Sequence, residues 1–118
     1  MRSIEEYLRN LRRQLAGADP AVIRFVREVL RKAARQKLDC CLCGEMAGDP
    51  MFALLLLGLG LRRFSMAPGD VPEIKKMVRS VTVRHARWVA RKVLTFETDR
   101  EVVNYLRDEA RRVLPEAV

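Results

Sequence analysis

The chain has 118 residues, of which 49% are hydrophobic and 32% charged, and its formal net charge is +8 from 23 Lys+Arg against 15 Asp+Glu. This length allows one domain, and the composition is typical of a folded globular chain rather than a disordered one. No stretch approaches the roughly 20 apolar residues that cross a bilayer, and residues 1–10 contain acids without the apolar core of a secretory signal, so we expect a cytoplasmic protein with no membrane association.

An amphipathic helix is predicted at the N-terminus. Ser3 and Glu6 form a capping box, and Gly17 is a typical helix end. The apolar stripe between them has helical spacing and consists of Ile4, Leu8, Leu11 and Leu15. We assign residues 1–17 to this additional helix, which we expect to cover apolar surface as a lid, and residues 18–118 to the main domain.

A second helix is predicted to lead into a short buried strand. Asp19 is a capping residue followed by Pro20 at the first helical position, and the apolar face lasts to about residue 36. After a very short connection, cysteine and apolar residues fill residues 38–43. That composition favours a strand that is covered on both faces.

Three cysteines lie within this strand. Cys40, Cys41 and Cys43 are too close together for ordinary disulfide geometry among themselves, which indicates a reducing compartment. A zinc site would require a second ligand pair, and the one histidine, His85, lies in a later helix, so we expect no metal site in this chain. We interpret Cys40 and Cys41 as small core residues.

The next elements complete a strand–helix–strand unit. Asp49 caps a short helix over residues 50–57 that is apolar nearly all round, and residues 62–66 follow as a second strand. Two strands joined by a crossover helix should be parallel, with a right-handed crossover. Cys43 would then lie at the carboxyl end of a strand, where parallel α/β proteins keep their chemistry.

Three further helices are predicted to close the chain. The loop at residues 67–71 precedes a helix over residues 72–79, Thr82 caps the next, and Thr98 with Glu101 forms a capping box for the last. The predicted fold class is therefore α/β and helix-rich, with one parallel βαβ unit surrounded by about five to six helices.

The motifs LCGEMAGDP (residues 42–50), GLGLRRFSM and VPEIKKMVRS, with the apolar helix between the first two, resemble the end of the phosphoenolpyruvate-utilising enzyme family. The likeness extends over roughly residues 19–114. Within the family it is strongest toward enzyme I of the bacterial sugar phosphotransferase system and its nitrogen-related paralogue. The resemblance implies that the main domain is part of a (β/α)8 barrel.

The same resemblance implies a role for Cys43. In this family the matching cysteine is the general acid that protonates enolpyruvate, after phosphoenolpyruvate has given its phosphoryl group to a histidine. A thiol suits this role because its pKa of about 8.5 keeps it protonated at neutral pH, yet it can give its proton to a strongly basic carbanion. Cys43 is our candidate proton donor.

The family's other functional groups are expected to lie outside the matched stretch. They are carboxylates that hold magnesium, arginines that bind the phosphate and carboxylate of the substrate, and a phosphorylated histidine. We therefore expect no cofactor in this chain and magnesium only in the intact family enzyme. His85 matches no phosphohistidine motif, and Glu45 and Asp49 are explained by turn and capping roles.

We interpret the chain as a truncated or stand-alone segment of a phosphoenolpyruvate-protein phosphotransferase that is inactive by itself. A two-stranded sheet needs its face and edges covered, which predicts a homo-oligomer or docking onto a longer barrel protein. Phosphoenolpyruvate would bind only where another chain completes the site.

A non-catalytic helical binding or regulatory module is the alternative. The basic residues would then bind an anionic or protein partner. They are spread along helix faces without interleaved aromatic residues, which argues against nucleic acid.

Overall fold

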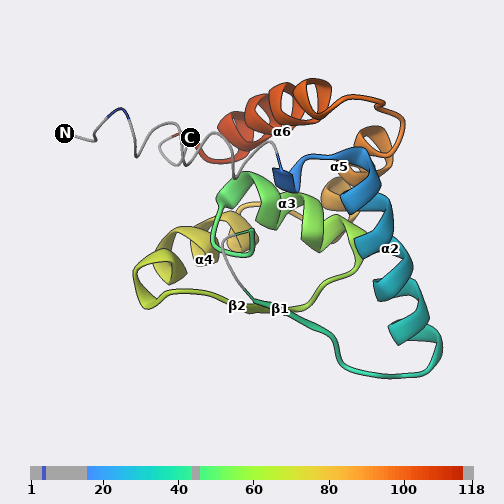
Figure 1. Cartoon of the computed structure of the whole chain (residues 1–118). Helices are drawn as coiled ribbons and strands as arrows, with labels where there is room; N and C mark the ends of the chain where they lie inside the picture. The colour runs from blue at the N-terminus through green and yellow to red at the C-terminus, as the bar shows by residue number, and fades with distance from the viewer. Residues whose placement is uncertain (1–3, 5–15, 44–45, 116–118) are drawn as a thin grey trace.

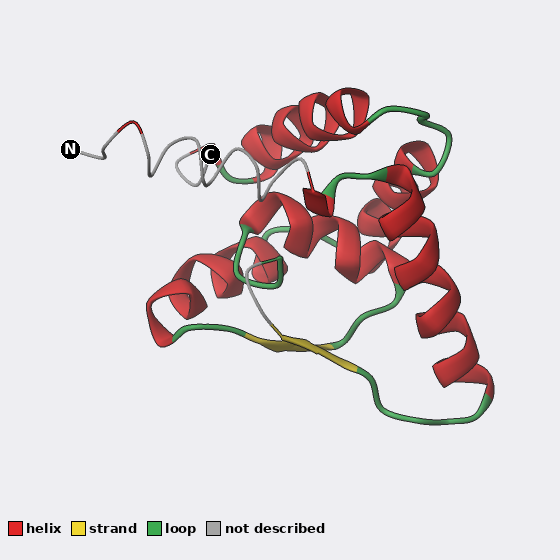
Figure 2. Ribbon diagram, in the orientation of Figure 1, coloured by secondary structure: helices red, strands yellow, loops and turns green. Residues whose placement is uncertain are grey.

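The described helices lie on one side of a short parallel sheet, as Figures 1 and 2 show. The computed structural model describes residues 4, 16–43 and 46–115, without the side chain of Cys43. The elements are α2 (Pro20–Arg35), β1 (Cys41–Cys43), α3 (Pro50–Leu59), β2 (Arg63–Ser65), the 3-10 turn η1 (Pro68–Asp70), α4 (Val71–Arg79), α5 (Val83–Val93) and α6 (Asp99–Val113). The predicted helix-rich α/β class is confirmed, and the barrel stays a prediction.

The predicted N-terminal helix over residues 1–17 falls almost wholly outside the described residues. Ile4 is helical and 79% exposed, and Ala16 and Gly17 are helical. The lid role of this segment stays a prediction.

Four helices begin where capping residues predicted. In each case a side-chain oxygen of the capping residue accepts a hydrogen bond from a backbone N–H of the first turn, which would otherwise have no partner in the helix. The pairs are Asp19 with Ala21 at 2.9 Å, Asp49 with Met51 at 3.1 Å, Thr82 with His85 at 3.1 Å and Thr98 with Glu101 at 3.2 Å. Local side-chain chemistry therefore determines these boundaries.

The two strands are parallel, as the strand–helix–strand pattern predicted. β1 is shorter than the predicted strand over residues 38–43, because it begins at Cys41. Its three residues lie opposite those of β2, in the register Cys41–Arg63, Leu42–Phe64 and Cys43–Ser65.

The sheet is also more exposed than predicted. Cys41, Arg63 and Ser65 are exposed, so the prediction of a first strand covered on both faces was wrong, and so was the interpretation of Cys41 as a core residue. Cys40 is only half-buried. The reason is that Leu42 and Phe64 pack toward the helices, whereas no described element covers the other face of the sheet.

The core of the molecule forms around α3. Every residue from Pro50 to Leu57 is buried, and α4, α5 and α6 pack against this helix (Figure 1). At Gly58, α3 and α5 approach so closely that a Cβ would overlap the carbonyl oxygen of Ala86 and lie 2.9 Å from the Cβ of Ala90. Although α3 is apolar, it is too short to span a membrane. No other helix in the described part of the chain is long and apolar enough to do so.

Candidate functional site

The first candidate site is the edge of the sheet where both strands end. Because β1 and β2 are parallel, their carboxyl ends lie at the same edge, and the register places Cys43 directly opposite Ser65. We call this edge the strand-end rim. The sequence placed Cys43 at such a position, and the structure adds Ser65 as its neighbour across the sheet.

Apolar packing supports the rim from the helix side. Leu42 and Phe64, which pair across the sheet next to the rim, pack against Leu30 of α2, Leu56 of α3 and Leu61. We call these five residues the sheet cluster. Leu56 and Leu61 are 0% and 1% exposed, so the residues that precede Cys43 and Ser65 rest on a closely packed base.

The loops that follow the two strands also meet near this rim. A Cβ on Gly48, in the turn after β1, would lie 2.7 Å from Oδ2 of Asp70, in η1 after β2. Only glycine allows this approach without movement of the Asp70 side chain. Sequence reasoning missed this contact because it joins two loops that are distant along the chain.

The acidic residues around the sheet lie at different places, Asp49 after the rim and Asp39 at the opposite end of the sheet, before β1 begins. Asp49 is the cap of α3, as predicted, and Glu45 lies outside the described residues. Asp39 forms an exposed ion pair with Arg63 at 3.3 Å. Exposed pairs of this kind contribute little to stability.

Magnesium, which the family resemblance implies, does not fit the described residues. Within residues 4, 16–43 and 46–115, no group of three or more His, Cys, Asp or Glu side chains could hold a metal ion. We therefore derive no step through a metal bound to this chain.

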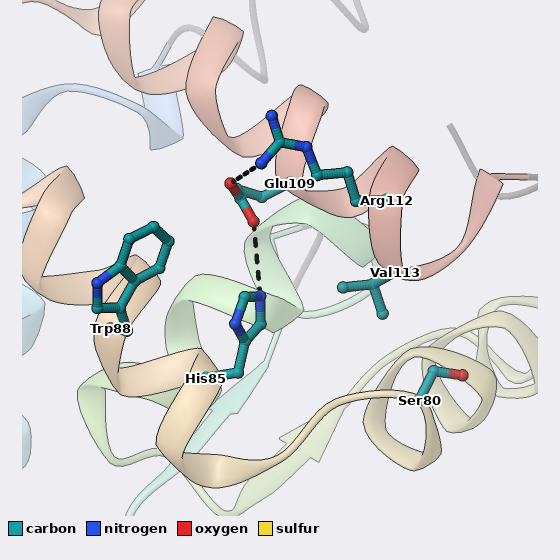
Figure 3. A pocket seen from close by; sticks show the side chains of 6 residues that line it. All are labelled: Ser80, His85, Trp88, Glu109, Arg112 and Val113. Atoms are coloured by element: carbon teal, nitrogen blue, oxygen red, sulfur yellow. Dashed lines mark hydrogen bonds and ion pairs between the residues drawn. The ribbon is translucent and has the colours of Figure 1, made fainter.

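The second candidate site is a surface depression formed by the end of α4, by α5 and by α6 (Figure 3). Its lining residues are Ser80, His85, Trp88, Glu109, Arg112 and Val113. In Figure 1, α3 lies between the sheet and α6.

Glu109 is the central group of the depression. Its side chain is only 5% exposed, and both carboxylate oxygens have partners: Oε1 accepts from Nη1 of Arg112 at 3.1 Å, and Oε2 lies 3.5 Å from Nε2 of His85. His85 also stacks on Trp88, with 5.9 Å between ring centroids. A buried carboxylate is tolerated when it is paired in this way, so the cluster ties α5 to α6.

Glu109 also influences Tyr105, one turn earlier on α6. Burial raises the pKa of the Tyr105 phenol, the negative charge of Glu109 raises it further, and Arg112 opposes the rise. The Tyr105 hydroxyl is buried without a hydrogen-bond partner among the described residues. Sequence reasoning missed Glu109, although a charged residue within the apolar face of α6 was a usable signal.

Comparison with known protein families gives a match to the part of the chain that includes the rim. A family model described as "PEP-utilising enzyme, PEP-binding domain", where PEP is phosphoenolpyruvate, matches residues 5–83. This stretch contains β1, α3 and β2 with the strand-end rim, and it stops at the first residue of α5.

Curated relatives give the same result. Phosphoenolpyruvate-protein phosphotransferases of Buchnera aphidicola subsp. Acyrthosiphon pisum and of Cupriavidus necator are 36% identical over 86 residues and 46% identical over 59 residues. These alignments cover 73% and 50% of this chain but only 15% and 10% of the relatives. A Salmonella typhimurium protein named "Phosphoenolpyruvate-dependent phosphotransferase system" is 39% identical over 83 residues, which is 70% of this chain and 11% of that protein.

Proposed function

Because the chain belongs to the PEP-utilising enzyme family, we propose that it provides the proton-donor segment of a phosphoenolpyruvate-dependent phosphotransferase, with Cys43 as the donor. The position of Cys43 carries this proposal: it is the last residue of β1, inside the matched stretch and at the carboxyl end of a parallel strand. In barrel enzymes the catalytic residues come from such strand ends.

The proposed step is a proton transfer from sulfur to carbon. When phosphoenolpyruvate gives its phosphoryl group to a histidine, the enolate of pyruvate remains. The Cys43 thiol donates its proton to the methylene carbon, which yields pyruvate and a thiolate, and the thiolate then takes a proton from water. General acid catalysis of this kind contributes about 10²–10⁴-fold to a rate.

We propose that this chain does not turn over phosphoenolpyruvate by itself. The described strands are two, each of three residues, whereas a barrel of this class has about eight. The alignments cover no more than 15% of the relatives. The family resemblance implies that the phosphate-binding arginines, the magnesium-binding carboxylates and the phosphorylated histidine all lie outside that portion. Phosphoryl transfer depends almost entirely on such positioning and charge.

The proposed partner is a longer barrel protein of the same family, with self-association as the other arrangement that would cover the sheet. In the first arrangement the partner supplies the phosphate-binding and magnesium-binding groups, and this chain supplies the acid. Phosphoenolpyruvate binds only to the assembled site.

A coupled assay of pyruvate formation tests the proposal. We expect no turnover by the chain alone. We expect turnover when the chain is co-expressed with the Buchnera aphidicola phosphotransferase from which the matched stretch has been deleted. Cys43→Ala should lower that rate at least about 100-fold. Cys41→Ala is the matched control, an exposed cysteine of the same strand, and should stay within about twofold of the unmodified chain.

Two results would contradict the proposal. Turnover by the chain alone would show that it needs no partner, and an unchanged rate with Cys43→Ala would remove the acid role. Salt-sensitive binding of an anionic partner without any Cys43 effect would instead favour the alternative of a non-catalytic binding module.

A further inference from the structure

We propose that the free edge of β1 and the exposed apolar stripe of α2 together form a docking surface for one parallel β-strand of a longer barrel protein. This inference rests on the proposed function, because it specifies where the completing partner binds. It is carried by three observations, which concern α2, the sheet and the connection between them.

The first observation is that α2 has more apolar surface than the described residues cover. Ile23 and Leu30 are buried, whereas Val22, Phe25 and Val29 are 39%, 69% and 40% exposed. With 100° of rotation per residue, these three side chains form a stripe adjacent to the buried face of the helix. We call them the α2 stripe.

The second observation is that the buried face of α2 already covers the sheet. Leu30 belongs to the sheet cluster with Leu42 and Phe64, and Val26 packs against the same cluster. Val26 lies between the buried face and the α2 stripe around the helix. The stripe therefore continues the face that covers the sheet, beyond the last strand that the described residues provide.

The third observation is the order of the elements. β1 pairs with β2 along one edge, and no described residue pairs with its other edge. A helix that leads into a strand of a parallel sheet is usually the right-handed crossover from a preceding strand, and it packs over both. Among the described residues no strand precedes α2. The unpaired edge of β1 and the α2 stripe therefore border a single strand position that no described strand fills.

The chemistry of this position selects its occupant. The incoming strand must run parallel to β1, because a crossover helix joins parallel strands. A second copy of this chain that pairs β1 with β1 about a two-fold axis would place the strands antiparallel, which leaves the α2 stripe without its strand. An apolar strand from a longer barrel chain satisfies both requirements, by the same backbone pairing that extended peptides use at sheet edges.

The positive charge of α2 favours a partner with acidic residues beside the incoming strand. α2 contains five basic residues, which are Arg24, Arg27, Arg31, Lys32 and Arg35. Its one acidic residue, Glu28, already pairs with Arg27 and Arg31. Acidic residues beside the incoming strand would complement this helix.

The test measures binding and backbone protection together. The probe is the Buchnera aphidicola phosphotransferase without its matched stretch, co-expressed with the 118-residue chain so that the two fold together. The intact Buchnera protein serves as a negative control, because its own segment occupies the position. We expect a complex only with the shortened probe, and slower hydrogen exchange at the amides of Cys41–Cys43 within it.

Matched variants assign the binding to the stripe. Val22→Ser with Val29→Ser should weaken the complex at least about tenfold. The control is Val78→Ser with Val83→Ser, two helical valines that are both 39% exposed but lie on α4 and α5. It should change the affinity by less than about twofold, and circular dichroism should show that both variants are folded.

The outcomes separate this inference from the proposed function. Equal weakening by both variants, unprotected β1 amides, a homodimer that buries the stripe, or no complex with the shortened probe would each overturn the docking surface. Turnover in the mixture that is insensitive to the stripe variant would overturn it and leave the proposed function intact. A complex that depends on the α2 stripe but forms no pyruvate would support the docking surface and overturn the proposed function.

Discussion

The helical part of the molecule and its sheet part differ in how completely each covers its own apolar surface. α3, α5 and α6 enclose a core in which Leu54, Val89 and Leu106 are each 0% exposed. In the sheet part, which comprises α2, β1, β2 and the connection from α2 to β1, Phe25 of α2 is 69% exposed and Leu38 of the connection is 61% exposed. The part that carries the candidate acid is therefore the part that remains open, and the part that is closed provides its stability.

Deletion of core side chains should give the largest measurable difference between the two parts. Leu54→Ala removes a fully buried side chain from α3 and should lower the free energy of unfolding by about 2–5 kcal/mol. Leu42→Ala removes a half-buried side chain of the sheet cluster and should lower the free energy of unfolding by about 1 kcal/mol. Urea denaturation checks both values, and equal costs would show that the sheet part is as closed as the helical part.

Addition of a methyl group at the close crossing of α3 and α5 should give the next effect. Gly58→Ala forces the new Cβ into the Ala86 carbonyl oxygen, and separation of the two helices should cost about 2–3 kcal/mol. Gly69→Ala, in η1, is the matched control, because no atom lies within 4 Å of the position that its methyl group would take. It should stay within about 0.5 kcal/mol. Similar thermal midpoints for the two variants would contradict the close crossing.

The smallest effect is expected at high pH. The pKa of Tyr105 is raised in the folded chain, so the neutral phenol is the form that the folded state favours. Its contribution to stability is complete below the unfolded pKa of about 10 and is lost as the pH rises through the folded pKa. Tyr105→Phe should remove this loss of stability at high pH. It should change the free energy of unfolding little near pH 7, because the hydroxyl has no hydrogen-bond partner among the described residues.

Unfolding measured between about pH 8 and 11 checks the Tyr105 prediction. The stability of Tyr105→Phe should fall less steeply above about pH 10 than that of the unmodified chain. Parallel curves for the two proteins would mean that Tyr105 ionises equally in the folded and unfolded states.

Local chemistry made much of the fold predictable. The caps Asp19, Asp49, Thr82 and Thr98 located four helix starts, because each satisfies free N–H groups within its own first turn. The strand–helix–strand order predicted the parallel pairing of β1 with β2, because two strands of one sheet that are joined by a crossover helix run in the same direction.

Features that depend on contacts between distant segments were not predictable. The exposure of Cys41 depends on whether a further layer covers the sheet, and an apolar strand composition does not contain that information. The same applies to Gly48 beside Asp70 and to His85 beside Glu109, since each pair joins elements that come together only in the folded chain. At the rim, the sequence predicted the position of Cys43, whereas its pairing with Ser65 across the sheet became known only from the register.

The burial of α3 has a consequence for the order of folding during synthesis. Its apolar residues are made before α5 and α6, the helices that cover them. Until α6 has left the ribosome, the apolar residues of α3 are not fully covered, and exposed apolar segments of this kind are prone to aggregate or to bind chaperones. α6 carries none of the proposed chemistry, yet its synthesis is the step that completes the cover of α3 and lowers the tendency of the nascent chain to aggregate.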